Sequence, residues 1–360
     1  MEAGENFCYT FGVLDALDVS GGRIVAHGWV VSLGERPVTE LRLAIGDAPV
    51  GSGHREFLPS PDVAKVWPQL PGTGHCRFSL QVEVGEEQRR RIASREVISI
   101  TPWAGDMPGV PLERIFPLSL GAAQAQESCQ VGGGDFVEIS FSFLALFRLL
   151  AGLRRDEPVL DAGCGIGRMA FALGHYLDAQ ARYEGFDISD RFVASARERF
   201  RSLPNFHFRH ADIFNRMYNP KGAIRAADFR FPYEDRSFGF AFATSVFTHM
   251  LRGDVRNYLR EIRRVLRPGG RCIATFFSLD AEARSGIEAG RSTLAFRHKL
   301  PDGCLVTSRR APEAAIAYPE PDLRHMIAEA GLALAAVHPG SWPGRGRFLT
   351  YQDVFLLVRE

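Results

Sequence analysis

Three glycines at alternating positions form the most distinctive pattern in this sequence, Val159-Leu160-Asp161-Ala162-Gly163-Cys164-Gly165-Ile166-Gly167-Arg168. A short apolar run leads into the loop, and a helical pattern follows it. Glycines here let the backbone turn tightly and let a ligand approach without an intervening side chain. Loops that hold a dinucleotide pyrophosphate usually read GxGxxG, whereas this one reads GxGxG after an acid, Asp161. The acid suits a ligand that carries a cationic amino group.

Two further acids follow predicted strands in the order that a nucleoside site requires. Asp187, in Gly185-Phe186-Asp187-Ile188-Ser189, ends the second strand. A carboxylate there can accept hydrogen bonds from both hydroxyls of a ribose, each worth roughly 1.5–3 kcal/mol. Asp212 and Ile213 follow the third strand, where the acid could accept the adenine amino group and the next backbone NH could meet a ring nitrogen.

The stretch over residues 240–250, Phe-Ala-Phe-Ala-Thr-Ser-Val-Phe-Thr-His-Met, places Ser245 and His249 after a fourth strand. The carboxyl edge of an open parallel sheet is where such folds bind ligands. His249 is therefore a candidate proton acceptor, with a packing residue as the equally weighted alternative. Trp342 and Arg345 lie between the last helix and the last strand, where either an active-site lid with substrate-binding residues or an ordinary turn would fit.

The elements that must position these residues alternate from residue 136 onward, as a parallel sheet with crossover helices requires. The predicted strands are residues 158–162, 182–188, 206–211, 238–246, 271–277 and 351–358. Residues 254–266 are the clearest helix, with Asp254 as N-cap and an Arg-Pro-Gly-Gly stop, and residues 321–330 form the last helix. The fold class is therefore α/β.

The preceding part of the chain has a different pattern. Residues 1–118 hold short runs rich in β-branched and aromatic residues, separated by turn sequences, which predicts a β-rich, sandwich-like domain. Residues 119–135 are small and polar and predict a linker, which leaves residues 136–360 as the second domain.

Composition limits the classes of partner. The formal net charge of the 360 residues is +1, which gives no electrostatic footprint for nucleic acid or a membrane surface. Six scattered cysteines without a CxxC pair predict neither a disulfide framework nor a metal site. No apolar run approaches the ~20 residues that cross a bilayer, and the amino terminus lacks a signal-peptide pattern, so we expect a cytoplasmic protein.

Four motifs taken together resemble the class I S-adenosylmethionine (SAM)-dependent methyltransferases, of the type 11-like domain. They are LDAGCGIG, GFDIS, FRFPYEDRSFGFAFATSVFTHM and YLREIRRVLRPGG, and the likeness extends over residues 136–360. The resemblance implies a Rossmann-like seven-stranded sheet with its last strand antiparallel, and SAM as cofactor.

The same resemblance assigns roles to the candidate residues. It puts Asp161, Gly163, Cys164, Gly165, Gly167 and Arg168 around the methionine part, Asp187 and Ile188 at the ribose, Asp212 and Ile213 at the adenine, and Ser245 near the methyl-bearing sulfur. The sequence departs from the family spacing through the long segment 214–228, so Asp228 competes with Asp212 for the adenine. We favour Asp212 because it directly follows a strand.

The amino-terminal region more loosely resembles β-sandwiches attached to glycan-modifying enzymes, through Gly28-Trp29, Ser60-Pro61-Asp62-Val63 and Gly74-His75-Cys76-Arg77-Phe78. A packing or dimerisation module fits the same residues.

These observations favour a SAM-dependent methyltransferase that acts on a hydroxyl of a sugar or glycan precursor, with His249 receiving the proton. The alternatives are a small-molecule or natural-product methyltransferase and a non-catalytic SAM-binding module. The absence of an Asn/Asp-Pro-Pro-Tyr/Phe tetrad argues against methylation of nucleic-acid amino groups, and GxGxG argues against a nicotinamide dehydrogenase.

Overall fold

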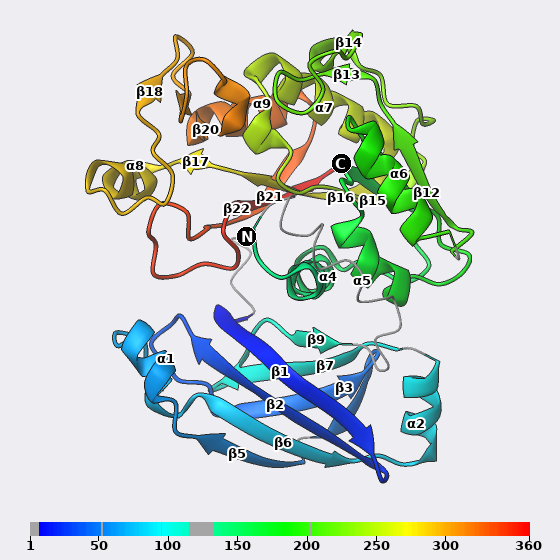
Figure 1. Cartoon of the computed structure of the whole chain (residues 1–360), viewed down its shortest axis with the longest axis vertical. Helices are drawn as coiled ribbons and strands as arrows, with labels where there is room; N and C mark the ends of the chain where they lie inside the picture. Colours follow the sequence, from blue (N-terminus) through cyan, green and yellow to red (C-terminus); the bar gives the residue numbers. More distant parts are fainter. Residues whose placement is uncertain (1–6, 52, 95, 115–132, 202) are drawn as a thin grey trace. The chain divides into compact units, whose positions relative to one another are not determined.

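The computed structural model describes residues 7–51, 53–94, 96–114, 133–201 and 203–360 (Figure 1). The chain divides into two compact units. The described residues up to Leu149, together with Arg168–Tyr176, make up the first unit, and Leu150–Gly167 with Leu177–Glu360 make up the second. Most of the predicted linker, residues 115–132, lies outside the described residues, and the predicted domain limits stay a prediction.

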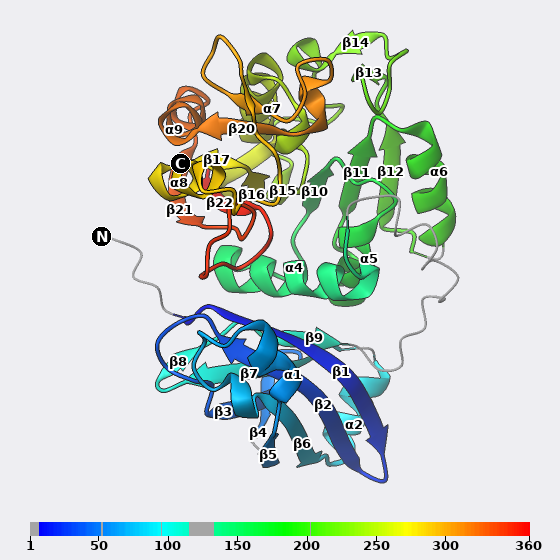
Figure 2. The same ribbon diagram turned by 60° about the vertical axis from the view of Figure 1, so that its left-hand side comes forward.

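The first unit is β-rich and contains two antiparallel sheets (Figure 2). One has the order β1-β2-β6-β5, and the other has the order β4-β3-β7-β8 with β9 paired to β7. The strands are β1 Thr10–Ser20, β2 Arg23–Ser32, β3 Glu40–Ile45, β4 Ala48–Gly51, β5 His54–Leu58, β6 Arg77–Glu83, β7 Ile98–Ala104, β8 Met107–Pro108 and β9 Leu112–Arg114. Short helices α1 Pro61–Val66, η1 Thr73–His75 and α2 Glu86–Ala93 connect them.

Buried and less buried side chains alternate along the strands of both sheets, which explains how the two sheets share one core. In β6 the side chains of Phe78, Leu80 and Val82 are buried, and in β3 those of Leu41, Leu43 and Ile45. Alternate residues of a strand point to the same face, so each strand directs one apolar row inward. All six belong to one hydrophobic cluster, which accounts for the stability of this unit.

Two helices of the first unit, α4 Phe136–Ala151 and α5 Arg168–Tyr176, pack on each other through aromatic residues. Phe136 and Phe141 both meet Phe171 edge-on, at centroid distances of 5.6 and 6.1 Å. The Ser140 hydroxyl accepts a hydrogen bond from the backbone NH of Ala172. Helix α4 therefore buries several of its apolar residues, among them Phe141, Leu144 and Phe147.

The second unit is Rossmann-like α/β. Its main sheet has seven strands in the order β12-β11-β10-β15-β16-β22-β21. The strands are β10 Val159–Ala162, β11 Tyr183–Asp187, β12 Phe206–His210, β15 Phe238–Ala243, β16 Leu266–Phe276, β21 Ala333–His338 and β22 Asp353–Val358. β22 runs antiparallel to both neighbours, while β10, β11, β12, β15 and β16 pair in parallel.

Helices α6 Asp190–Arg199, α7 Arg252–Val265 and α9 Glu320–Glu329 belong to this unit, and α6 runs alongside β12 in both ribbon views (Figures 1 and 2). The central strand β15 reads Phe-Gly-Phe-Ala-Phe-Ala and is almost wholly buried. A strand covered on both faces carries such a continuous apolar run instead of an alternating one. The buried sheet therefore holds in place the residues that follow its strands.

Several local predictions need correction. Helix α7 begins at Arg252 and its N-cap is Leu251, so Asp254 lies in the first turn, where its carboxylate accepts from the Leu251 NH. β15 ends at Ala243, before the 3-10 turn η3 Phe247–His249. The sequence prediction also lacked β21, whose Ala-rich segment has low strand propensity.

A second small sheet was not predicted either. It has the order β17-β20-β19-β18 and is built from β17 Ser278–Leu279, β18 His298–Lys299, β19 Leu305–Val306 and β20 Ile316–Pro319. Its strands are two to four residues long, too short for a periodic pattern to appear. The helix α8 Ala281–Glu288 and the turn η4 Pro312–Ala314 lie in the same stretch of chain.

Candidate active site

The carboxyl ends of parallel strands bring the predicted site residues to one edge of the main sheet. Asp161 lies near the end of β10, Asp187 ends β11, and Asp212 follows β12. Ser245 follows β15, which pairs in parallel with β10. The strand order therefore gathers the four residues where open α/β sheets bind ligands.

The glycine loop has a conformation that its glycines make possible. Gly163, Gly165 and Gly167 have φ values of 94°, 52° and 82°. A Cβ on Gly163 would lie 2.3 Å from Cγ2 of Val246, and one on Gly167 would lie 2.5 Å from the Phe200 ring. The pattern GxGxG is thus required both by backbone geometry and by close packing within the unit.

Gly163→Ala is expected to weaken SAM binding at least tenfold, because the strained backbone and the clash cost on the order of 1–3 kcal/mol at the loop. Isothermal calorimetry with SAM and thermal unfolding measure the two effects. Gly253→Ala is the matched control, because a Cβ there meets nothing within 4 Å. Equal SAM affinity in both variants would contradict a role for the loop in binding.

The Asp187 carboxylate accepts hydrogen bonds from two backbone NH groups. Its Oδ2 accepts the Gly165 NH at 2.9 Å, and its Oδ1 accepts the Ser189 NH at 2.8 Å. Burial raises the pKa of this carboxyl, and the backbone donors oppose that rise. Each carboxylate oxygen keeps a free lone pair, so Asp187 can order the loop and still receive ribose hydroxyls.

Asp161 is a buried acid with one unsatisfied oxygen. Its side chain is 1% exposed, and the Tyr183 hydroxyl donates to its Oδ2 at 2.6 Å. Oδ1 is buried and has no hydrogen-bond partner among the described residues. Burial raises the pKa of this carboxyl to about 8. An ammonium group of a ligand would satisfy the free oxygen and favour the charged form, so the site fits the amino group of SAM.

The two candidate acids for the adenine lie in different surroundings. Asp212 is exposed, its Oδ1 accepts the Asn219 side chain at 3.4 Å, and Ile213 beside it is buried. Asp228 is exposed in the turn η2 Ala226–Asp228, where Arg225 donates to both of its oxygens. An acid engaged by arginine is a poorer acceptor for an amino group, which favours Asp212 and leaves the assignment a prediction.

Ser245 adopts an unusual backbone conformation, with φ of 58°. Its NH donates to Oγ1 of Thr275 at 2.7 Å, and its hydroxyl accepts from Nε2 of Gln352 at 2.9 Å. Thr275 in turn donates to Gln352. Strained conformations of this kind persist where surrounding contacts hold them, and they are enriched at functional sites. The sequence analysis did not predict Gln352 and Thr275 as site residues, because only their hydrogen bonds to Ser245 in the structure reveal them.

His249 is half-buried at the end of η3. Its Nδ1 lies 2.9 Å from the Glu313 carbonyl oxygen, and the ring meets Tyr218 edge-on at 5.5 Å. Because a carbonyl only accepts, Nδ1 carries the hydrogen, and in the neutral ring Nε2 is the basic nitrogen. Burial lowers the pKa of the imidazole below 6.5. The ring is therefore neutral near pH 7 and able to accept a proton.

Trp342 and Arg345 are buried in a polar network with Asp353. Trp342 is fully buried and its Nε1 donates to Asp353, while Arg345 is 6% exposed and pairs with Asp353, Asp280 and Glu282. This arrangement supports an ordered structural turn, and substrate binding by the two residues stays a prediction.

The remaining cofactor candidates differ in their environment. Cys164 is 5% exposed, and burial raises the pKa of its thiol well above 9, so it fills the loop as an inert side chain. Ile188 packs partly against the main core. Arg168 begins α5 in the first unit and donates to the Gly133 carbonyl, and its cofactor role stays a prediction.

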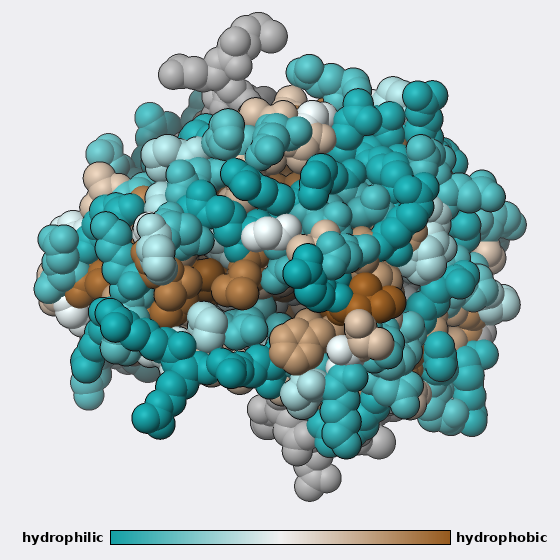
Figure 3. All heavy atoms as spheres, turned by 90° about the horizontal axis from the view of Figure 1, so that it is seen from above, coloured by the Kyte–Doolittle hydropathy of each residue, from teal (hydrophilic) through white to brown (hydrophobic). Residues whose placement is uncertain are grey.

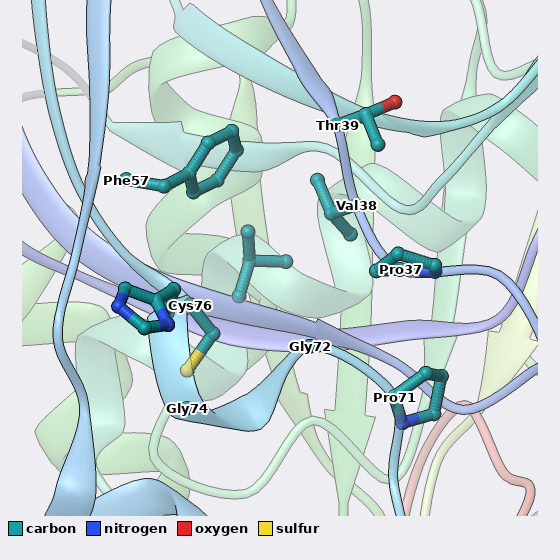
Figure 4. A pocket seen from close by; sticks show the side chains of 10 residues that line it. Pro37, Val38, Thr39, Phe57, Pro71, Gly72, Gly74 and Cys76 are labelled. Atoms are coloured by element: carbon teal, nitrogen blue, oxygen red, sulfur yellow. The ribbon is translucent and has the colours of Figure 1, made fainter.

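No group of three or more His, Cys, Asp or Glu side chains that could hold a metal ion occurs within the described ranges. The first unit has a hollow of ≈ 360 Å³, lined by Pro37, Val38, Phe57, Pro71 and Cys76 among others (Figure 4). Its lining is largely apolar and lacks a charged side chain. In the part of the chain that the structure describes, no helix has the length and apolar character to span a membrane.

Comparison with known proteins finds similarity over one part of the chain. Residues 160–274 match the model of the methyltransferase domain family. An O-methyltransferase from Penicillium expansum, cnsE, is 35% identical over 122 residues, which are 33% of this chain and 37% of that protein. Methyltransferase GfsG from Streptomyces halstedii is 34% identical over 115 residues, 32% of this chain and 36% of that protein. The chain thus spans little more than a third of the length of these relatives.

A SAM-dependent methyltransferase from Aquifex aeolicus superposes with a TM-score of 0.39 at 18% identity, covering 62% of this chain and 92% of that one. The matched residues 160–274 include the glycine loop, Asp187, Asp212, Ser245 and His249. Residues 160–274 of this chain are thus similar to the methyltransferase domain family, and S-adenosylmethionine is the cofactor that this match implies.

Proposed function

We propose that the protein methylates a hydroxyl oxygen of a small acceptor, and that the acceptor is a sugar or glycan precursor. The observation that carries the proposal is the contact of 2.9 Å between Nδ1 of His249 and the Glu313 carbonyl oxygen, in the turn that follows β15, because it leaves Nε2 as the nitrogen able to accept a proton. Relatives from Penicillium expansum and Aspergillus nomiae that are named O-methyltransferases support an oxygen acceptor.

SAM supplies a methyl group made electrophilic by its sulfonium. When SAM is bound, Asp161 would offer its free Oδ1 to the amino group, Asp187 would accept from the ribose hydroxyls, and Asp212 with Ile213 would hold the adenine. His249 receives the proton of the acceptor hydroxyl at Nε2 and later releases it to water. Alignment of the two partners can supply roughly 7–11 kcal/mol of the barrier, and proton transfer adds to it.

Two other functions remain distinguishable by experiment. A natural-product methyltransferase would share the whole site, and methylation of non-sugar hydroxyls by labelled SAM would favour it. A non-catalytic module would bind SAM and methylate no acceptor in such a screen. The net charge of +1 speaks against a nucleic-acid acceptor. A cytoplasmic location is part of the proposal, because the scattered cysteines have no spacing typical of a disulfide framework.

Asp187→Ala is expected to weaken SAM binding by roughly 10- to 150-fold for each ribose bond that is lost. The variant also frees the Gly165 and Ser189 NH groups, so Asp187→Asn, which keeps one acceptor oxygen, should lie between it and the wild type. Calorimetry measures affinity, and circular dichroism reports the fold. Glu198→Ala, which removes an exposed acid of α6, is the control. Unchanged affinity in Asp187→Ala would refute the cofactor assignment.

A further inference from the structure

Two segments far apart in the sequence hold His249 from different sides. The Glu313 carbonyl, in η4, accepts from Nδ1. The Asn215 side-chain amide donates to the main-chain carbonyl of His249 at 3.3 Å, and the Tyr218 ring lies edge-on to the imidazole, with an interplanar angle of 79°. The orientation of the imidazole is thus determined by residues outside η3.

The segment that carries Tyr218, residues 213–225, is ordered by its own hydrogen bonds. Oδ1 of Asn215 accepts the NH groups of Met217 and Tyr218, at 3.0 and 3.1 Å. The Asn219 amide donates to the Ile213 carbonyl at 3.0 Å. A Cβ on Gly222 would lie 2.3 Å from the Ile213 carbonyl carbon, so the turn closes tightly there. The segment 213–225, which lengthens the usual family spacing, is therefore stabilised by its own hydrogen bonds.

One contact joins the two segments. The Arg216 guanidinium donates to the Arg310 carbonyl at 2.7 Å, and Arg310 lies just before η4. The segment 213–225 and the segment around η4 therefore form a connected frame around His249.

Tyr218 contacts this histidine and is also influenced by an acid of the predicted cofactor site. Its side chain is 44% exposed, beside Met217 at 48% and Phe214 at 45%. Burial raises the pKa of its phenol, and the Asp187 carboxylate adds to that rise, so the phenol lies within electrostatic reach of the ribose acid. Figure 3 views the molecule from the end that carries β13 Ile213–Phe214 and β14 Ile224–Arg225, and shows hydrophobic patches on a mostly hydrophilic face.

We propose that Tyr218 is a positioning residue for methyl transfer: its ring closes one side of His249, fixes the imidazole so that Nε2 faces the acceptor, and keeps water from it. This inference rests on the proposed role of His249 as proton acceptor. Tyr218 itself transfers no proton, because the edge-on contact uses its ring and not its hydroxyl.

We expect Tyr218 to act on His249 by burying its imidazole ring. The elements packed against η3 are η4, β16 and β20. Their titratable or charged groups are Glu313 on η4, Arg267, Arg271 and Cys272 on β16, and Tyr318 on β20, whose hydroxyl donates to the Met250 carbonyl. Burial is the largest cause of the lowered pKa of His249, and the carbonyls of Glu313 and Ala314 oppose it. Removal of the Tyr218 ring should admit water and reduce that effect.

The test is an NMR titration of His249 in the full chain labelled on histidine, with the resonance assigned by its loss in His249→Gln. Tyr218→Ala should raise the pKa of His249 toward 6.5 and lower turnover roughly 10- to 100-fold, with SAM affinity unchanged. Tyr218→Phe keeps the ring and should match the wild type in both measurements. Met217→Ala, at a neighbouring exposed position, is the control that should leave the titration unchanged.

An unchanged His249 titration in Tyr218→Ala would overturn the proposal, and so would a Tyr218→Phe variant as impaired as the alanine variant. If Tyr218→Ala does not fold by circular dichroism, Tyr218→Leu, which fills part of the same space, takes its place with a smaller expected shift in the same direction. Failure of the proposed function is separable, because it would appear in the wild type as SAM binding without methylation of any acceptor, while the titration shift would persist.

Discussion

His249→Gln is expected to lower turnover by roughly 100- to 10,000-fold while SAM affinity stays within a few-fold of the wild type. Glutamine has a similar length, and its amide can still donate to the Glu313 carbonyl that His249 contacts at 2.9 Å. It cannot accept a proton near neutral pH. The variant thus removes the basic nitrogen and preserves the packing. Release of S-adenosylhomocysteine with an acceptor from the screen measures turnover.

The pH profile separates a base from a packing residue. Burial lowers the pKa of His249 from 6.5. As pH rises through this lowered pKa the imidazole loses its proton, so kcat/KM should rise with it. This acidic limb should disappear in His249→Gln. A packing residue would lower thermal stability and leave the shape of the profile intact. His325→Gln, an exposed histidine of α9, is the control for histidine loss in the same unit.

If turnover in His249→Gln stays within a few-fold of the wild type, a residue other than His249 is the base. The acids and histidines of the segment between Leu279 and Glu320 are then the next candidates, since this segment contributes Glu313 to the surroundings of His249. Buried Oε2 of Glu313 has no hydrogen-bond partner among the described residues, so Glu313→Gln would be tested first.

The positions of the three candidate cofactor acids could be predicted from the sequence, because they depend on residues that are close together in the chain. Asp161, Asp187 and Asp212 each stand at or just after the end of a short apolar strand, and parallel strands bring such ends to one edge. The glycine loop joins β10 directly to a helix, so its chemistry follows from adjacent residues. Sequence order alone therefore identifies the edge and the acids that lie on it.

The acceptor side could not be predicted because it is held by contacts between distant residues. Glu313 meets His249 through a backbone carbonyl, and no residue type marks a carbonyl in the sequence. The burial of Trp342 depends on Asp353, and that of Arg345 depends on Asp280 as well. Nothing in the local sequence distinguishes such a network from an exposed turn, so the sequence left a lid and an ordinary turn as alternatives.

Arg148→Ala is expected to destabilise the first unit by roughly 3–5 kcal/mol, the largest loss of stability that we predict. Arg148 in α4 donates to the carboxylate of Glu113 in β9, which is 2% exposed, and also pairs with Asp47 at 3.0 Å. Oε2 of Glu113 has no hydrogen-bond partner among the described residues. Loss of the arginine would leave this acid buried and unpaired.

Urea unfolding followed by tryptophan fluorescence measures this effect, because Trp29, Trp67 and Trp103 belong to the first unit and only Trp342 to the second. Arg90→Ala is the control in the same unit, since its pair with Glu86 in α2 is exposed and such pairs contribute less than about 1 kcal/mol. The double variant Glu113→Gln/Arg148→Met, which removes both charges, should recover most of the loss.

The stability loss should depend on pH in a defined direction. Burial raises the pKa of Glu113 from 4.5 to about 7, against the opposing effect of Arg148. Because the folded state then binds the proton more tightly than the unfolded state, this group's contribution to stability falls as pH rises from 4.5 through about 7. Without Arg148 the pKa rises further and the fall continues to higher pH. The difference between Arg148→Ala and the wild type should therefore be larger at pH 8 than at pH 5, and a difference that is constant with pH would show that the Glu113 charge is not what Arg148 stabilises.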